Sequence, residues 1–217
     1  MPWHCKPTGG YIKESTEAYD NALMAYSILA SKGWGLLAFC GMWGNVQSES
    51  AYNPWRWQSD IVLPYGDPRI DYQNSHAYGL VQWDEAAKYI NGGRGYLGYG
   101  PNYSDRQGSN DDGTAQMYFL EDTAVSSGQY FPNPYHPYQI SYDNYKAASI
   151  NDYSIDWITH AWFWNYERGT WDDGRTAAAT YWYNTLGGIT PPPPPTGRKI
   201  PIWLLFKLKD RNRGDYS

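Results

Sequence analysis

Cysteine is scarce in this chain of 217 residues, which contains only Cys5 and Cys40. Two cysteines, one near the N-terminus and one within an apolar stretch, do not indicate a disulfide framework. Histidine is also scarce, and the four histidines show no metal-ligand spacing of the HExxH or CxxC kind. We therefore expect no structural metal and no cofactor.

Long apolar runs are missing as well. No segment approaches the roughly 18 apolar residues of a membrane span, and residues 200–206 are apolar but far too few. The N-terminus lacks the basic start and apolar core of a secretory signal. The sequence thus predicts neither a membrane span nor a signal peptide. If the protein acts outside the cell that made it, it would therefore leave by lysis or as part of a larger particle.

Positive charge is in deficit, and the formal net charge is −5. Residues 196–217 carry six basic and two acidic side chains, a net charge of +4, which leaves −9 on the remainder. An acidic body argues against a nucleic-acid-binding protein, which normally presents a basic face. The basic tail is compatible with an acidic partner or an anionic surface, and equally with simple solvation.

Aromatic residues, by contrast, are abundant. Twelve Trp and 22 Tyr accompany only five Phe, so most of the aromatic side chains carry a polar group. Such side chains can stack on the C–H face of a sugar while the hydroxyl or indole N–H donates a hydrogen bond. Any one of them could equally fill a core. For the set as a whole, we interpret the composition as that of a carbohydrate groove.

The sequence pattern predicts a helix-dominated α+β domain. Caps and apolar periodicity favour helices at residues 15–32, 36–48, 114–125, 142–149, 154–166 and 176–186, with a short one from about residue 84. Proline and glycine break up residues 53–78, where we expect irregular chain with a small β-hairpin. Gly41 and Gly44 within the second helix indicate that another backbone or a substrate comes close.

The proline run at residues 191–195 marks a domain boundary. Such a run forms a semi-rigid polyproline II spacer. We therefore divide the chain into a catalytic domain at residues 1–189, a linker at residues 190–197 and a short basic tail at residues 198–217, which we expect to be poorly ordered.

Glu49 is the strongest candidate for chemistry. It stands near the expected end of the second helix, within Gln47-Ser48-Glu49-Ser50 and shortly before Asn53-Pro54. The negative end of the helix macrodipole and water-excluding aromatic neighbours would both favour its protonated form. A protonated carboxyl is what a general acid requires when it protonates a glycosidic oxygen.

Two further blocks accompany Glu49 in order and spacing. Gly79-Leu80-Val81-Gln82-Trp83 and Asn165-Tyr166-Glu167-Arg168 resemble, with Glu49-Ser50, the motifs of goose-type lysozymes and lysozyme-like lytic transglycosylases. A closer resemblance, over residues 11–186, is to the phage tail lysozymes, the peptidoglycan-degrading domains of phage tail tips. The segments that carry this closer resemblance also include Cys40-Gly41-Met42-Trp43-Gly44-Asn45, Trp57-Gln58 and Tyr181-Trp182-Tyr183.

The resemblance implies a lysozyme-like, two-lobed domain with a substrate cleft that hydrolyses the MurNAc–GlcNAc linkage of bacterial peptidoglycan. It implies that Glu49 is the general acid, and that the protein is virion-associated, with other tail components as candidate partners of the basic tail. The residues expected to bind substrate lie in the matching blocks and are Ser50, Trp57, Gln58, Gln82, Trp83 and Tyr166.

Several alternatives stay open. The chain has Gly169 where related sequences commonly continue Tyr-Glu-Arg with Pro, and it shows no clear second catalytic carboxylate, for which Asp60 and Asp71 are candidates. Retention and inversion are therefore not distinguished. A lytic transglycosylase forming 1,6-anhydro ends and a non-catalytic cell-wall-binding tail module are alternative functions. A cysteine peptidase would need Cys40 as its nucleophile, although this cysteine fits a buried helix position better.

Overall fold

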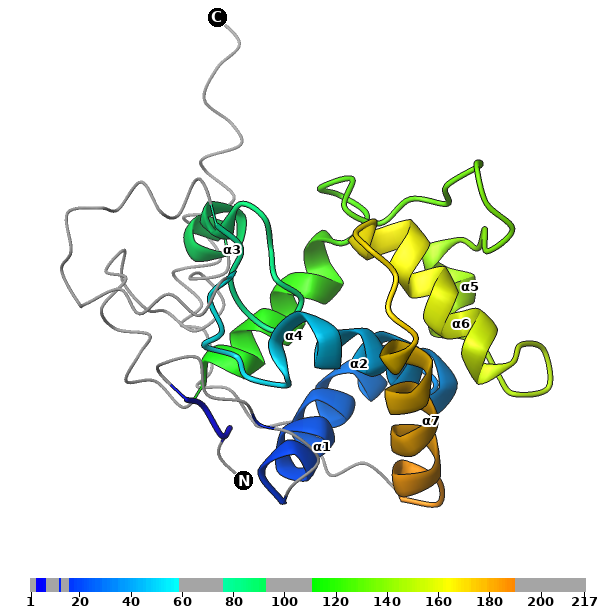
Figure 1. The fold of residues 1–217 in the computed structure, drawn as a ribbon, viewed down its shortest axis with the longest axis horizontal. Coiled ribbons are helices and arrows are strands. Elements are labelled where there is room, and N and C mark those ends of the chain that lie inside the picture. The colour runs from blue at the N-terminus through cyan, green and yellow to red at the C-terminus, as the bar shows by residue number, and fades with distance from the viewer. Residues whose placement is uncertain (1–2, 7–11, 13–15, 59–75, 93–110, 190–217) are drawn as a thin grey trace, which may run out of the picture.

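The computed structural model describes residues 3–6, 12, 16–58, 76–92 and 111–189, and Figure 1 draws the other residues as a grey trace. The described chain is predominantly helical. Its elements in order are α1 (Thr16–Ala30), α2 (Leu36–Ser50), α3 (Ala86–Gly92), α4 (Asp112–Thr123), α5 (Tyr142–Lys146), α6 (Ile155–Trp162), the π-helical turn η5 (Phe163–Glu167) and α7 (Gly174–Leu186). Every predicted helix is present within a few residues of its predicted bounds.

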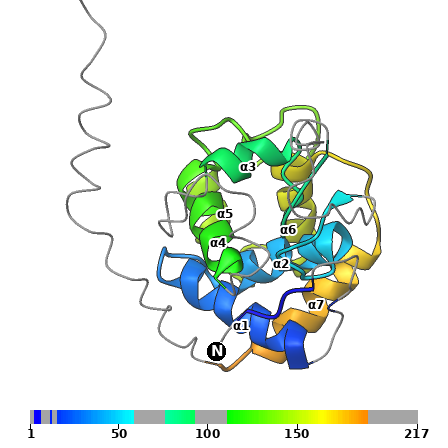
Figure 2. The ribbon, with the colours of Figure 1, turned by 90° about the vertical axis from the view of Figure 1, so that its left-hand side faces the viewer.

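Helix α2 forms the centre of the fold. Figures 1 and 2 show it in the middle of the other helices, and it packs most extensively against α7 and then against α6. All residues from Leu37 to Val46 are buried. A helix that is buried on every side is typical of a core position. The burial ends at Val46, since Gln47 and Glu49 are half buried and Ser48 is exposed, so the last turn of α2 reaches the surface of the domain.

The two glycines of α2 explain how the neighbouring helices come so close. A Cβ atom at Gly41 would lie 2.8 Å from the Ile158 side chain on α6, and one at Gly44 would lie 2.5 Å from the backbone oxygen of Arg175. The prediction that another backbone comes close at these positions is confirmed. The lower helix propensity of glycine, about 1 kcal/mol per residue relative to Ala, is offset by this packing.

The remaining helices flank α2. Helix α1 packs on α2 and α4, while α6 and α7 pack on α2 and on each other. Figure 1 shows α3 and α4 on one side of α2, and α5 and α6 on the other. A half-buried carboxylate, that of Glu121 on α4, connects the two sides. It accepts hydrogen bonds from Trp34 Nε1 at 2.7 Å and Tyr142 Oη at 2.9 Å, and it pairs with Lys146.

No β-strand longer than an isolated bridge occurs in the described ranges. Antiparallel bridges join Trp57 to Tyr78 and Tyr78 to Trp83, and Gln58 N donates to the Ala77 carbonyl at 2.9 Å. The predicted hairpin falls mainly on residues 59–75, outside the described residues. The polyproline linker and the basic tail lie outside them too.

Candidate active site

Glu49 lies in the last turn of α2, as predicted, but its main partner comes from a distant part of the chain. The left-handed conformations of Ala51 and Tyr52, with φ of 48° and 63°, end the helix just after it. Its side chain is 21% exposed, and its Oε1 accepts a hydrogen bond from Arg175 Nη2 at 2.6 Å. The sequence had indicated an apolar aromatic setting, whereas the structure places a guanidinium against this carboxylate.

Arg175 is held in place from several sides. It lies in the first turn of α7, and only 6% of its side chain is exposed. Its Nη1 donates to Asn45 Oδ1 at 3.0 Å, and its guanidinium lies 5.0 Å from the ring centre of Phe163. Buried charge is stable only when it is paired and hydrogen-bonded. Because Arg175 is held by these other contacts, its ion pair with Glu49 holds the Glu49 carboxylate in position.

A second carboxyl, that of Glu167, belongs to the same cluster. It ends η5, and its Oε1 accepts a hydrogen bond from Trp162 Nε1 at 2.9 Å. Burial raises the pKa of Glu167 well above the ordinary 4.5, and repulsion from Glu49 raises it further, while Trp162 and the charges of Arg175 and Arg168 act in the opposite direction. Glu167 thus favours its protonated form beside an ion-paired Glu49.

Tyr166 connects this cluster to the 79–83 segment. Its ring is buried and stacks on Trp162, with centroids 4.3 Å apart. Burial raises the pKa of Tyr166 well above its usual range, and a side-chain hydrogen bond with Trp83 opposes this rise. Trp83 in turn stacks on Tyr89 at 4.9 Å. The three sequence blocks that carry Glu49, Trp83 and Tyr166 therefore meet in one region of the domain.

Comparison with known proteins agrees with this convergence. The family model of the phage tail lysozymes matches residues 20–186, which include all three blocks. The chain belongs to the phage tail lysozyme family. It is also 41% identical over 71 residues to morphogenesis protein 1 of Bacillus phage B103, a match that covers 33% of this chain and 17% of that relative. The chain thus spans well under two thirds of that relative.

Gln82, expected to face the substrate, uses its amide within its own loop. Its Nε2 donates to the carbonyls of Arg56 at 3.0 Å and Gly79 at 2.8 Å. Its φ of 47° is left-handed, a conformation that costs energy for a side chain larger than glycine. These two hydrogen bonds hold the strained turn that presents Trp83. In this phage tail lysozyme, Gln82 shapes the 79–83 segment, and a contact of Gln82 with substrate stays a prediction.

The other residues expected to bind substrate also make internal contacts. Ser50 is buried and its hydroxyl donates to the Val46 carbonyl at 3.2 Å. Trp57 is buried against Tyr78, with ring centroids 4.7 Å apart, and Gln58 Oε1 accepts from Ala77 N at 3.0 Å. Their roles toward substrate stay predictions. Asp60 and Asp71, the candidates for a second carboxylate, lie outside the described residues.

The aromatic residues divide between core and surface. Much of the surplus fills the interior, where the largest fully buried side chains include Trp43, Trp162, Trp182, Tyr52, Tyr89, Tyr145 and Tyr166. Here the core alternative, rather than a carbohydrate groove, accounts for the composition, because indole and phenol rings take the place of aliphatic side chains.

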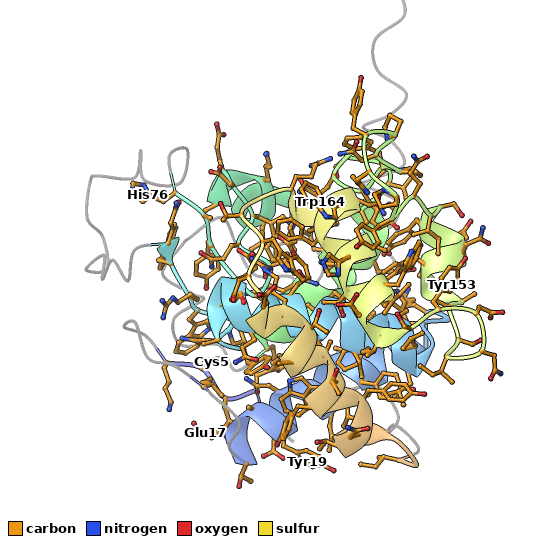
Figure 3. All side chains as sticks on the ribbon, turned by 45° about the vertical axis from the view of Figure 1, so that its right-hand side comes forward. Cys5, Glu17, Tyr19, His76, Tyr153 and Trp164 are labelled. Carbon is orange, nitrogen blue, oxygen red and sulfur yellow. The ribbon has the colours of Figure 1, made fainter. Side chains whose placement is uncertain are left out.

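A second group of aromatics is only half buried and runs beside α6. We call it the aromatic row; it consists of Tyr153, Trp157, Tyr138, His160 and Trp171. Its stacked pairs have ring centroids 4.6 Å apart for Tyr153 and Trp157, 4.7 Å for Tyr138 and His160, and 3.7 Å for His160 and Trp171. Figure 3 shows Tyr153 near the start of α6 and Trp164 beyond the end of α6, in η5.

Two other kinds of site, a cysteine nucleophile and a metal centre, are less well supported. Cys40 is fully buried, and burial raises the pKa of its thiol far above the usual range, which disfavours a reactive thiolate. Among the described residues, no group of three or more His, Cys, Asp or Glu side chains is placed to hold a metal ion. Within the same residues, no helix is long and apolar enough to cross a membrane.

Proposed function

We propose that this phage tail lysozyme is a muramidase that cleaves the MurNAc–GlcNAc backbone of bacterial peptidoglycan, with Glu49 as its general acid. The observation that carries the proposal is the clamped carboxyl of Glu49 at the end of α2, 2.6 Å from a buried Arg175. A glycosidase needs a carboxyl group held in one orientation, because the proton must reach the leaving oxygen as the C–O bond breaks.

The chemistry follows from that placement. Glu49 donates its proton to the glycosidic oxygen, the bond from the sugar C1 to this oxygen breaks, and positive charge develops at C1. Water then adds to C1, and the Glu49 carboxylate accepts the proton that the water releases. The guanidinium of Arg175 stabilises the carboxylate in the interval. The net reaction consumes one water molecule and regenerates the acid.

The aromatic row supports a polysaccharide as the substrate. These side chains are half buried, so each leaves part of its surface accessible, and the C–H faces of sugars can stack on aromatic rings. The row ends at Trp171, which packs against Phe163 with centroids 5.2 Å apart, and Phe163 lies under the guanidinium of Arg175. A glycan chain stacked along the row would therefore run toward the Glu49 cluster.

Clearing of a purified peptidoglycan suspension tests the proposal. We expect clearing by the wild type and loss of clearing in Glu49→Gln, which keeps the size of the side chain but carries no acidic proton. Glu17→Gln is the matched control, because Glu17 is a carboxylate at the start of α1, 41% exposed (Figure 3). Clearing by Glu49→Gln at the wild-type rate would contradict the role of Glu49. Inactivity of the wild type with retained pelleting on cell walls would indicate a binding module.

The products identify the reaction. Mass spectrometry of the digest should show reducing MurNAc ends if the enzyme hydrolyses the bond. Anhydro ends would instead identify a lytic transglycosylase, in which the sugar's own hydroxyl takes the place of water. Cleaved peptide stems would identify a peptidase.

Location on a phage tail is the second part of the proposal, and family membership supports it. The relative from phage B103 bears the name of a morphogenesis protein. The composition change at residue 191 suggests that the linker and the basic tail attach the catalytic domain to another virion component. Deletion of residues 191–217 should leave peptidoglycan clearing intact. Loss of clearing would contradict the proposal that these residues serve attachment and not catalysis.

A further inference from the structure

A buried glutamine on α4, Gln116, joins two segments that are far apart in the chain. Its side chain is fully buried. Its Oε1 accepts a hydrogen bond from Leu80 N at 2.7 Å, and its Nε2 donates to the Pro54 carbonyl at 2.7 Å. Leu80 lies 36 residues and Pro54 62 residues before Gln116 in the sequence. A single carboxamide therefore holds residues 53–58 and residues 76–83 against the same helix.

A second buried side chain of α4, Asp112, supports Gln116. It lies one turn earlier, and its Oδ2 accepts hydrogen bonds from Gln116 Nε2 at 3.1 Å and from Tyr78 Oη at 2.7 Å. Its other carboxylate oxygen accepts one from the hydroxyl of Tyr89 on α3. We call Asp112 and Gln116 the α4 pair. Buried polar networks in which each group has a partner make the chain rigid and favour one arrangement, so the α4 pair fixes how Tyr78 and its neighbours are oriented.

Gly79 lies directly on the Gln116 carboxamide. It has a φ of 89°, and a Cβ atom at this position would lie 2.8 Å from Gln116 Oε1 and 3.0 Å from the Trp83 ring. Gly79 N donates to the Arg56 carbonyl at 2.9 Å, and the same carbonyl accepts a hydrogen bond from Gln82 Nε2 at 3.0 Å. The two segments are therefore bonded to each other as well as to Gln116.

These hydrogen bonds matter because the two segments are irregular. Residues 53–57 and 76–83 consist of turns, a bend and isolated bridges. Leu80 and Pro54 are buried, and a buried backbone group that loses its partner destabilises the arrangement that buries it. Loss of the Gln116 carboxamide should therefore displace both segments.

The accessible side chains of the two segments are polar. Gln58 is exposed, and Arg56 and Gln82 are half buried. Amide and guanidinium groups donate hydrogen bonds that sugar hydroxyls can accept. Residues 53–58 also follow the turn that ends α2, shortly after Glu49. The segments thus present hydrogen-bonding groups near the end of the helix that carries Glu49, while Gln116 holds them from the buried side.

We propose that Gln116 is a positioning residue for substrate binding: its buried carboxamide holds residues 53–58 and 76–83 in the arrangement that receives the glycan beside Glu49. The inference rests on the proposed function. Gln116 is fully buried and acts through the two segments. Glu49 is held separately, by Arg175 on α7. Gln116 should therefore determine the affinity for the glycan and leave proton transfer by Glu49 unchanged.

The kinetics of Gln116→Met on soluble, uncross-linked peptidoglycan strands test the inference. Met is similar in size to Gln but makes none of the hydrogen bonds of the carboxamide. We expect KM to rise about tenfold, equivalent to about 1.4 kcal/mol of binding free energy, while kcat stays within about twofold of the wild type. Pelleting on insoluble peptidoglycan in the Glu49→Gln background should show the same tenfold weakening. Urea unfolding identifies conditions in which every variant is fully folded, and all assays are made there.

Glu121→Met is the matched control, because Glu121 lies on the same helix and also joins α4 to other parts of the chain. It accepts hydrogen bonds from Trp34 and Tyr142, and their loss should lower stability without changing KM. An equal rise in KM in both variants would make the effect a general consequence of disturbing α4 and would overturn the inference. An unchanged KM in folded Gln116→Met would overturn it too, whether or not kcat falls.

A milder pair of variants decides the question if Gln116→Met does not fold. Tyr78→Phe removes the hydroxyl that donates to Asp112, and Tyr142→Phe removes the hydroxyl that donates to Glu121. Both variants keep the ring and lose one hydrogen bond to a carboxylate on α4. We expect KM to rise about threefold in Tyr78→Phe and to stay at the wild-type value in Tyr142→Phe. Equal KM values in the two variants would contradict the positioning role.

The outcomes separate this inference from the proposed function. If Glu49→Gln clears peptidoglycan at the wild-type rate, the role of Glu49 fails, and the positioning role of Gln116 stands or falls on its own KM. If the wild type binds peptidoglycan without cleaving it, the muramidase fails and the pelleting assay decides the role of Gln116. If the wild type neither binds nor cleaves peptidoglycan, both proposals fail.

Discussion

The backbone of Gly44 on α2 lies directly against the backbone of Arg175 on α7. A Cβ atom at position 44 would lie 2.5 Å from Arg175 O and 2.8 Å from Ala179 N. This approach brings the first turn of α7 onto the last turns of α2, where the Arg175 guanidinium reaches Asn45 and Glu49. A missing side chain on one helix thus sets the position of the charged group on the other.

Gly44→Ala should therefore be costly. The added methyl group meets backbone atoms, which cannot rotate away, and overpacking of this kind costs about 1–3 kcal/mol. We expect a loss in this range in the free energy of unfolding measured with urea, together with reduced clearing of peptidoglycan. Gly169→Ala is the control, because no atom lies within 4 Å of the position that its added methyl group would take. Equal stability of the two variants would contradict the close approach.

The ion pair between Arg175 and Glu49 should appear as a coupling energy. Arg175→Met leaves Glu49 without its guanidinium and should cost about 3 kcal/mol of unfolding free energy, the lower end for a buried pair because Glu49 is partly exposed. In the double variant with Glu49→Gln the loss should be smaller than the sum of the single losses. Urea unfolding of the four proteins in this cycle measures the difference, and strictly additive losses would argue against the pair.

The stability of the folded protein should depend on pH through Glu167. Its pKa is raised above 4.5 in the folded state, so between 4.5 and the raised value the folded protein binds more protons than the unfolded chain. Stability contributed by the protonated form is fully present below pH 4.5 and is lost as pH rises through that window. The Gln side chain of Glu167→Gln does not ionise, so this variant does not lose stability as pH rises through the window. Relative to the wild type, it should gain up to about 1.4 kcal/mol per pH unit within the window.

Thermal or urea unfolding of both proteins at several pH values checks this expectation. Asp172 does not confuse the result, because its lowered pKa makes its contribution disappear only as pH falls below its ordinary 3.8. A constant difference between wild type and Glu167→Gln across pH 5 to 8 would show that Glu167 does not titrate as described.

The thiol of Cys40 should be inert in the native protein. It is fully buried, and burial raises its pKa far above neutrality. In a Cys5→Ser background, in which Cys40 is the remaining cysteine, we expect no reaction with a disulfide reagent at pH 7 until the protein is unfolded. Cys40→Ala should still clear peptidoglycan, at a cost of about 1 kcal/mol in stability. Loss of activity in a folded Cys40→Ala protein would revive the peptidase alternative.

The aromatic row should contribute to substrate binding. Trp171→Ala removes a half-buried indole that stacks on His160 at 3.7 Å. Loss of one aromatic contact of about 1–1.5 kcal/mol corresponds to roughly five- to tenfold weaker binding to insoluble peptidoglycan. Pelleting assays in the Glu49→Gln background avoid digestion of the substrate. Tyr135→Ala is the control, because Tyr135 is 93% exposed and lies outside the row, and equal weakening by both variants would contradict a specific stacking surface.

Local signals explain what could be predicted about the fold. The second helix was expected at residues 36–48 and spans Leu36–Ser50, and the last was expected at residues 176–186 and spans Gly174–Leu186. Apolar periodicity and helix-ending glycines depend on neighbours a few residues away, so the sequence displays them directly. The helix expected at residues 154–166 was right in place, but its last turn is π-helical, which no local pattern indicated.

The helices, the family and the position of Glu49 at a helix end follow from the order of the residues alone. The groups that surround that carboxyl follow from the packing of distant helices. Arg175 is 126 residues away in the chain and was not singled out from the sequence, while Glu167 was noted only as part of the motif around Tyr166. Ion pairs across such separations depend on how whole helices pack, and here that depends on Gly44, whose missing side chain lets α7 bring its arginine to Glu49.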